Sequence, residues 1–139
     1  MQNYGTEQYL PYITECNNMK TSYQALPAFI TKDGSTIREF MHPAQHAALG
    51  ARSQSFAEAI VEPGAATFLH HHKTIEEIYH ITTGSGRMVL GDKTFDIAVG
   101  DTVVIVPGTQ HCVTNTGNDP LKILCACSPA YSDLDTVLL

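Results

Sequence analysis

The chain has few basic residues, few cysteines and no long apolar run, and each shortage narrows what it can be. Its 139 residues carry 8 Lys and Arg against 14 Asp and Glu, which gives a net charge of −6. It contains no basic run that could follow a phosphate backbone, so we expect no nucleic-acid partner. The apolar runs are also far too short to cross a bilayer, so we expect no membrane partner.

The first residues lack the features of a secretory signal, because no cation precedes Lys20 and no apolar core follows. We therefore expect a cytoplasmic location. Four cysteines are too few for a disulfide scaffold, and in a reducing compartment we expect them to remain thiols. Cys125 and Cys127 alternate on one predicted strand, where they should act as small buried hydrophobes lining the interior.

Helical periodicity is almost absent, and a chain of this length suits one domain. We predict an N-terminal arm over residues 1–35 and a β-barrel domain over residues 36–139. The arm is polar and holds four of the six tyrosines, which supply contact area together with a polar tip. It could lie over the barrel or reach a neighbouring subunit, and both arrangements remain open at this point.

From Ser53 onward, short runs typical of strands alternate with Gly, Pro, Asn and Asp at regular intervals. Gly91-Asp92, between two such runs, is a hairpin signal. The predicted strands cover residues 56–61, 67–72, 77–82, 86–90, 93–97, 102–106, 111–115 and 121–127. Eight strands are enough for a closed or two-sheet barrel, so the pattern predicts an all-β fold.

Four side chains within this pattern are suited to binding one metal ion. His70 and His72 are two residues apart, so on a strand they point to the same face. Glu77 begins the next predicted strand and in a hairpin would return beside the histidine pair. His111 opens a later strand immediately after a Pro-Gly turn. Three nitrogens and one oxygen can therefore converge on one point.

These donors predict a first-row divalent ion, namely Zn, Fe, Mn or Ni, because Ca and Mg sites are built almost wholly from oxygen. Four protein ligands on an octahedral ion leave two adjacent positions for water or substrate. His71, between the two ligands, and His80, three residues after Glu77, should face the other way and take no part.

Two longer motifs contain these residues, and through them the sequence resembles the cupin superfamily. The first motif reads Gly64, AATFL, His70-His71-His72, KTIE, Glu77, IYHITT and Gly84. The second reads Gly100, DTVVI, Val106-Pro107-Gly108, TQ, His111, CVT and Asn115. The one departure is Val106, which stands where the family pattern has its first Pro; this affects the turn and leaves the ligand set whole.

The resemblance implies a double-stranded β-helix, which is the jelly-roll barrel of cupins, formed by a single domain. It also implies that His70, His72, Glu77 and His111 are the metal ligands and that the chain forms a homodimer. It does not choose a reaction, because cupins that resemble one another catalyse different chemistry or only bind ligands.

Two further residues are candidates for catalysis. If Glu77 faces inward, alternation places Tyr79 inward as well, so Tyr79 is the nearest candidate acid or hydrogen-bond donor. Its alternative is a core tyrosine at the barrel mouth. His42, upstream of the first motif, could cap the open end and act as a base, or simply lie on a solvated face.

Three functions fit this set of residues. The first is a metal-dependent enzyme with isomerase- or epimerase-like chemistry on a small carbonyl or hydroxy-acid substrate of the sugar type. The second is an Fe(II)-dependent dioxygenase, for which the same four ligands suffice. The third is a module that binds a small ligand through its metal without catalysis. The substrate and the physiological metal stay open at this stage.

Overall fold

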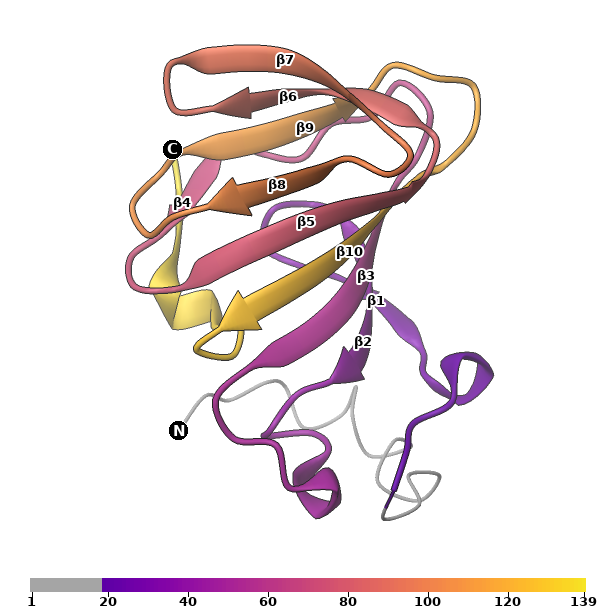
Figure 1. Cartoon of the computed structure of the whole chain (residues 1–139), viewed down its shortest axis with the longest axis vertical. Helices are drawn as coiled ribbons and strands as arrows, with labels where there is room; N and C mark the ends of the chain where they lie inside the picture. Colours follow the sequence, from indigo (N-terminus) through magenta and orange to yellow (C-terminus); the bar gives the residue numbers. More distant parts are fainter. Residues whose placement is uncertain (1–18) are drawn as a thin grey trace.

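The computed structural model describes residues 19–139, which form two antiparallel sheets facing each other (Figure 1). One sheet has six strands in the order β1-β2-β3-β10-β5-β8, and the other has five in the order β11-β4-β9-β6-β7. The strands are β1 (Ala28–Ile30), β2 (Thr36–Met41), β3 (Ser55–Val61), β4 (His70–His72), β5 (Glu76–Thr83), β6 (Ser85–Leu90), β7 (Lys93–Ala98), β8 (Thr102–Ile105), β9 (His111–Asn115), β10 (Leu121–Ser128) and β11 (Thr136–Leu138). Short 3-10 turns are η1 (Tyr23–Ala25), η2 (Ala47–Leu49) and η3 (Asp133–Asp135). The predicted all-β double-stranded β-helix is confirmed.

The eight predicted strands correspond to β3 through β10, with ends that differ by three residues at most. Three strands were not predicted. β1 and β11 have three residues each, too few to show a period, and in β2 the charged side chains interrupt the alternation. The first 18 residues of the predicted arm lie outside the described part of the chain. Its remaining residues contribute β1, which pairs with β2 at the edge of the six-stranded sheet.

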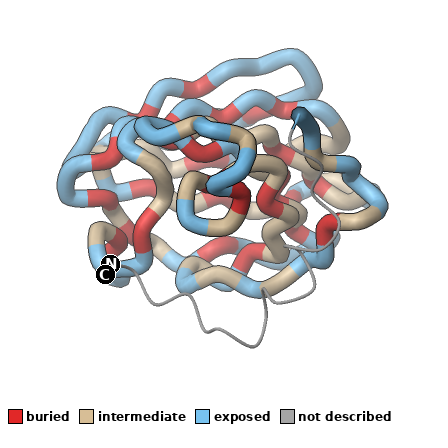
Figure 2. Tube along the Cα trace, turned by 90° about the horizontal axis from the view of Figure 1, so that it is seen from below, coloured by how far each residue is buried: buried red, intermediate tan, exposed pale blue. Residues whose placement is uncertain are grey.

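Inward-facing residues alternate with outward-facing ones along the long strands, as the short buried stretches in Figure 2 show. The centre of the core consists of side chains that are almost completely buried, at about 1.5–3 kcal/mol of hydrophobic stabilisation each. These are Ile81, Met88, Ile105, Val113, Leu121 and Ile123. The buried polar side chains, which include His70, His72 and His111, occupy other parts of the interior.

Two residues that close the motifs serve the fold. Gly84 has φ +81°, and a Cβ there would lie 2.8 Å from the carbonyl oxygen of Pro120, so only glycine fits. Asn115 is buried, and its side-chain amide donates to the carbonyls of Val61 and Asp119. Its side-chain oxygen accepts from the backbone N–H of Gly117. The two motif ends therefore fix the turns that follow β5 and β9. Among residues 19–139, no helix has the length and apolarity that a membrane span requires.

Candidate metal centre

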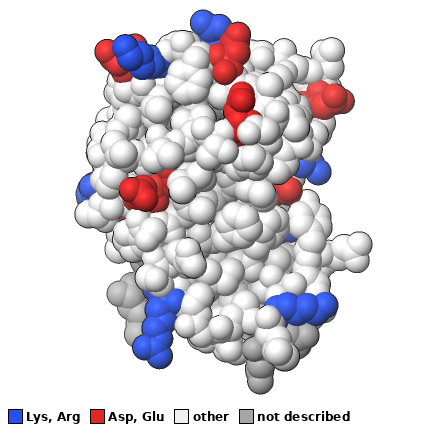
Figure 3. Space-filling model, in the orientation of Figure 1, with Lys and Arg blue, Asp and Glu red and all other residues white. Residues whose placement is uncertain are grey.

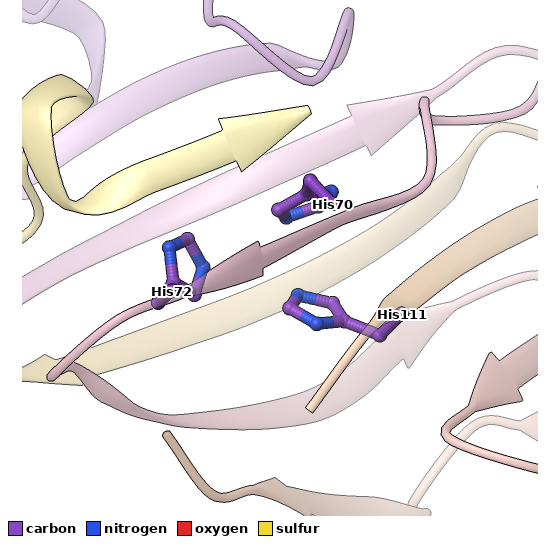
Figure 4. A group of neighbouring side chains, drawn as sticks. All are labelled: His70, His72 and His111. Carbon is purple, nitrogen blue, oxygen red and sulfur yellow. The ribbon is translucent and has the colours of Figure 1, made fainter. Parts of the chain in front are cut away.

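The barrel brings three buried histidines together in its interior (Figure 4). His70 and His72 point to the same side of β4, as their spacing predicts, and His111 comes from the start of β9. β4 pairs with β9 at the position where His70 lies opposite His111. One ring nitrogen from each histidine lies within 4.8 Å of the others. The three rings therefore share one small volume.

The outer nitrogens of His70 and His111 are held by the backbone. His70 Nδ1 lies 2.7 Å from the carbonyl oxygen of Phe68, and His111 Nδ1 lies 2.9 Å from that of Thr109. A carbonyl oxygen can only accept, so in both rings Nδ1 carries the proton and donates it. In the neutral ring, Nε2 then presents its lone pair toward the centre of the group.

The outer nitrogen of His72 is also held as a donor, but by a side chain. Its Nδ1 lies 3.0 Å from Oγ1 of Thr136, and that hydroxyl donates its own proton to the carbonyl oxygen of Ser132 at 2.8 Å. Thr136 therefore accepts from His72 Nδ1–H. All three histidines have their outer nitrogen fixed as a donor, which is the arrangement that orients histidine ligands in metal sites.

Glu77, at the start of β5, completes the group. Its Oε2 lies 3.0 Å from Nε2 of His72 and 3.4 Å from Nε2 of His111. Its Oε1 accepts from Sγ of Cys127 at 3.5 Å. Burial raises the pKa of this carboxyl, but hydrogen bonding and charge from His111 and His72 outweigh the burial and bring the pKa down to about 2. Glu77 is therefore a carboxylate at neutral pH.

A metal ion fits these donors. When all three rings are neutral, their inward lone pairs face the Glu77 carboxylate, and the repulsion is relieved by positive charge among them, either protons on the Nε2 atoms or a metal ion. Nε2 of His111 is buried, and apart from the long 3.4 Å contact with Glu77 Oε2 it has no polar partner among the described residues. Burial, followed by the nearby His111, lowers the pKa of His70 and favours the neutral ring that binds metals. The donor types suit a divalent transition ion and leave its identity open.

A cavity of about 50 Å³ adjoins the histidines and is open at one side. It is large enough for a few water molecules, or for a small organic molecule that replaces them. Its wall includes His70, His72 and Glu77 at one end. The remaining wall comes mainly from β3, β10 and the β1–β2 hairpin.

Small side chains create this cavity. Across the six-stranded sheet, Glu39, Ala57, Cys125 and Tyr79 lie opposite one another on β2, β3, β10 and β5, and all four line the cavity. The middle two side chains are small, so the volume above them stays empty. Cys125 and Cys127 are buried in this wall, and Cys112, Cys125 and Cys127 are free thiols, as the sequence led us to expect.

The two catalytic candidates differ in position. Tyr79 is buried in the cavity wall with its ring centroid 6.0 Å from that of His111. Burial, together with the negative Glu77, raises the pKa of Tyr79 well above its usual value, so its hydroxyl remains a neutral donor.

The cavity wall, as the described residues form it, does not include His42. Its Nδ1 accepts from the N–H of Ala44 at 3.1 Å, and its Nε2 donates to the carbonyl oxygen of Tyr131 at 2.9 Å. Both ring nitrogens are therefore engaged by the backbone, and a catalytic role for His42 stays a prediction.

The two histidines expected to face away do so. His71 is only half-buried on the opposite side of β4 from its neighbours, and His80 is exposed with its Nδ1 2.8 Å from Oγ1 of Thr102. Neither belongs to the buried histidine group. The spacing within β4 and β5 was therefore enough to separate ligand candidates from bystanders.

Two carboxylates in the cavity wall were missed by sequence reasoning, Asp33 and Glu39. Oδ1 of Asp33 accepts three hydrogen bonds at 2.7–3.0 Å. The donors are the Thr31 hydroxyl, the Ser35 hydroxyl and the Ser35 backbone N–H. Its Oδ2 lies 4.0 Å from Nε2 of His70. The Asp33-Gly34 pair is a turn signal, but nothing local shows that this turn folds back over the histidines.

Comparison with known proteins agrees with this geometry. Residues 57–127, about half of the chain, match the cupin domain family. A protein of Methanocaldococcus jannaschii described only as uncharacterized is 49% identical over 121 residues, which cover 87% of this chain and 94% of that protein. The chain belongs to the cupin domain family, as the two motifs predicted.

Two further similarities are more distant. A mannose-1-phosphate guanylyltransferase of Escherichia coli is 31% identical over 80 residues, and the match spans 56% of this chain but only 17% of the enzyme. A crystal structure from Thermotoga maritima, titled a predicted oxalate decarboxylase, is 23% identical with a TM-score of 0.69 and covers 80% of this chain and 99% of its own. At that identity the likeness shows the fold.

Proposed function

We propose that this cupin is a metal-dependent enzyme with isomerase- or epimerase-like chemistry on a small carbonyl or hydroxy-acid substrate. The observation that supports it is that three buried histidines cluster with the Glu77 carboxylate, beside a cavity whose wall also holds side chains able to transfer protons. The ligands in this proposal are His70, His72, Glu77 and His111. A bound Zn, Fe, Mn or Ni ion would supply Lewis acidity toward a substrate oxygen.

The protein side chains supply the remaining requirements of such a reaction. Asp33 offers an oxygen at the histidine end of the cavity, where it can take a proton from the carbon next to a carbonyl and return it to the neighbouring atom or the opposite face. Tyr79 stays neutral and can donate a hydrogen bond to the substrate oxygen on which charge develops. In these proton transfers the substrate neither gains nor loses an atom overall.

The name of one relative favours the same class of substrate. A mannose-1-phosphate guanylyltransferase handles a phosphorylated sugar by its name. Because the match spans only a small part of that enzyme, this supports a sugar-type substrate without naming one.

Deuterium exchange tests the proposal directly. The protein, reconstituted separately with Zn, Mn, Ni and anaerobic Fe(II), is incubated in D2O with small hydroxy acids, 2-oxo acids and sugar phosphates. We expect metal-dependent deuterium incorporation next to the carbonyl, measured by NMR, and its loss in His111→Ala. His80→Ala is the matched control, since His80 is exposed. A substrate that binds without any exchange would contradict the proposal.

The same samples separate the alternatives. Oxygen consumption by the Fe(II) protein in the presence of a bound substrate would replace the isomerase proposal with the dioxygenase. Binding without exchange and without oxygen uptake would leave a non-catalytic ligand-binding cupin.

We also propose a homodimer in the cytoplasm. A cross-strand row of apolar side chains, Phe56, Ala126, Ile78 and Val104, runs over the outer face of the six-stranded sheet, and three of the four are exposed. The middle of that face carries few charged side chains (Figure 3), which suits contact with the same face of a second copy. Light scattering should give a dimer that Ile78→Glu weakens, and a monomer would contradict this proposal.

The free thiols of Cys112, Cys125 and Cys127 support the proposed cytoplasmic location.

A further inference from the structure

Glu39 is a buried acid in the cavity wall. It lies at one end of the cross-strand row Glu39, Ala57, Cys125 and Tyr79, and Tyr79 lies at the other end. Only 4% of the residue is exposed, and it lines the same cavity as the histidines. Its Oε2 is buried without a hydrogen-bond partner among residues 19–139. Leaving such an atom unsatisfied destabilises the folded protein. A purely structural position next to Ile37 and Phe29 in the same wall would be filled better by an apolar side chain.

The surroundings of Glu39 keep it neutral. Its Oε1 lies 4.0 Å from Nε2 of His42, but that nitrogen already donates to a backbone carbonyl. Burial, followed by the negative charge of Asp133 in η3, raises the pKa of Glu39 to about 8. At neutral pH Glu39 therefore carries a proton that it can donate.

We infer that Glu39 binds the end of the substrate that is remote from the metal, by donating a hydrogen bond to an acceptor oxygen there. The inference rests on the proposed function and makes it more specific. Glu39 lies three inter-strand steps from Tyr79, roughly 14 Å along the curved sheet and less across the cavity. The substrate class is a small hydroxy acid or keto acid that binds the metal at one end and carries a second carboxylate or carbonyl at the other.

A pair of probes that differ only at the far end tests this inference. Malate and 2-hydroxybutanoate share the hydroxy-acid end, but malate carries a carboxylate where 2-hydroxybutanoate carries a methyl group. Affinities for the metal-loaded protein are measured by calorimetry at about pH 6.5 and about pH 9. The ratio of the two affinities cancels any titration at the metal end, which both probes share.

At the lower pH we expect malate to bind about tenfold more tightly than 2-hydroxybutanoate or better, which is the gain that a charge-assisted hydrogen bond gives. At the higher pH Glu39 ionises, repels the malate carboxylate and abolishes the preference. Glu39→Gln keeps a donor that does not ionise, so it should keep the preference at both pH values. Glu39→Leu should lose it at both. Among residues 19–139, the titratable groups that influence the pKa of Glu39 or contact its carboxyl are Asp133 and His42; both remain in both variants, so they cannot produce this difference.

The outcomes distinguish the two proposals. Equal affinity for the two acids, or a preference that survives in Glu39→Leu, overturns the role of Glu39 and leaves the metal-dependent function standing. A preference that depends on Glu39 but persists in His111→Ala supports Glu39 and contradicts the metal-dependent function. Absence of binding by both acids overturns both.

Discussion

The two ends of the cavity each hold one buried glutamate, and the two glutamates are in opposite states. At the histidine end, His72 and His111 lower the pKa of Glu77 to about 2. At the other end, burial and Asp133 raise the pKa of Glu39 to about 8. Residue type and burial are the same, so the neighbouring charges decide which carboxyl is an anionic ligand candidate and which is a neutral donor.

The largest effect that tests this contrast is on stability of the metal-free protein. The pKa of Glu39 is raised by folding, so its contribution to stability is present below about pH 4.5 and is lost as pH rises through about 8. At about 1.4 kcal/mol per tenfold change in proton affinity, the full loss is on the order of 5 kcal/mol. Above pH 8, Glu39→Gln should therefore be more stable than the wild type in urea denaturation. Parallel pH profiles of the two proteins would contradict a neutral Glu39.

The next effect is on metal affinity at the histidine end. Removing His111 deletes one of three converging nitrogens, and we expect His111→Ala to weaken binding at least about 100-fold, or about 3 kcal/mol. Titration against a competing chelator measures it. His71→Ala is the matched control, because His71 lies directly between the two β4 ligand candidates but faces away. Equal losses in the two variants would show that the effect is not one of ligation.

A smaller loss should follow from a change behind the histidines. Thr136→Val removes the oxygen that accepts from His72 Nδ1–H, and loss of such a partner weakens metal binding about 10–100-fold. Thr102→Val removes the same kind of Thr–His contact at the exposed His80 and should leave metal affinity unchanged. If Thr136→Val behaves like Thr102→Val, the orientation of His72 does not depend on this hydrogen bond.

The smallest effect concerns the thiols. Cys127 donates to Oε1 of Glu77, whereas Cys125 donates to the carbonyl oxygen of Ile123. A single weak hydrogen bond to a carboxylate suggests a several-fold loss of metal affinity in Cys127→Ala and none in Cys125→Ala. The two variants are compared in the same chelator titration, and an equal response would rule out a positioning role for Cys127.

The same contrast explains which parts of the site were predictable. The histidine end lies on β4, β5 and β9, whose alternation and turns are local, so spacing alone placed His70, His72, Glu77 and His111 on inward faces. The strands from β3 to β10 were predicted for the same reason. The sequence also separated His71 and His80 from the ligand candidates by their period.

The opposite end depends on contacts between distant residues. Glu39 follows Arg38 in a charged segment and looks like a surface carboxylate in the sequence. It is buried because β2 pairs with β3, which places it in the wall of the cavity. Asp33 likewise reaches His70 through a hairpin whose fold-back no local pattern shows. Local periodicity therefore predicts the candidate ligands, while the groups that would select a substrate depend on tertiary structure.

The most direct test of the central claim is elemental analysis of protein purified without a metal-affinity column. We predict about one transition-metal ion per chain in the wild type and in His80→Ala, and almost none in a His70→Ala/His72→Ala double variant that remains folded by circular dichroism. An unchanged metal content in the folded double variant would contradict the assignment of these histidines as ligands.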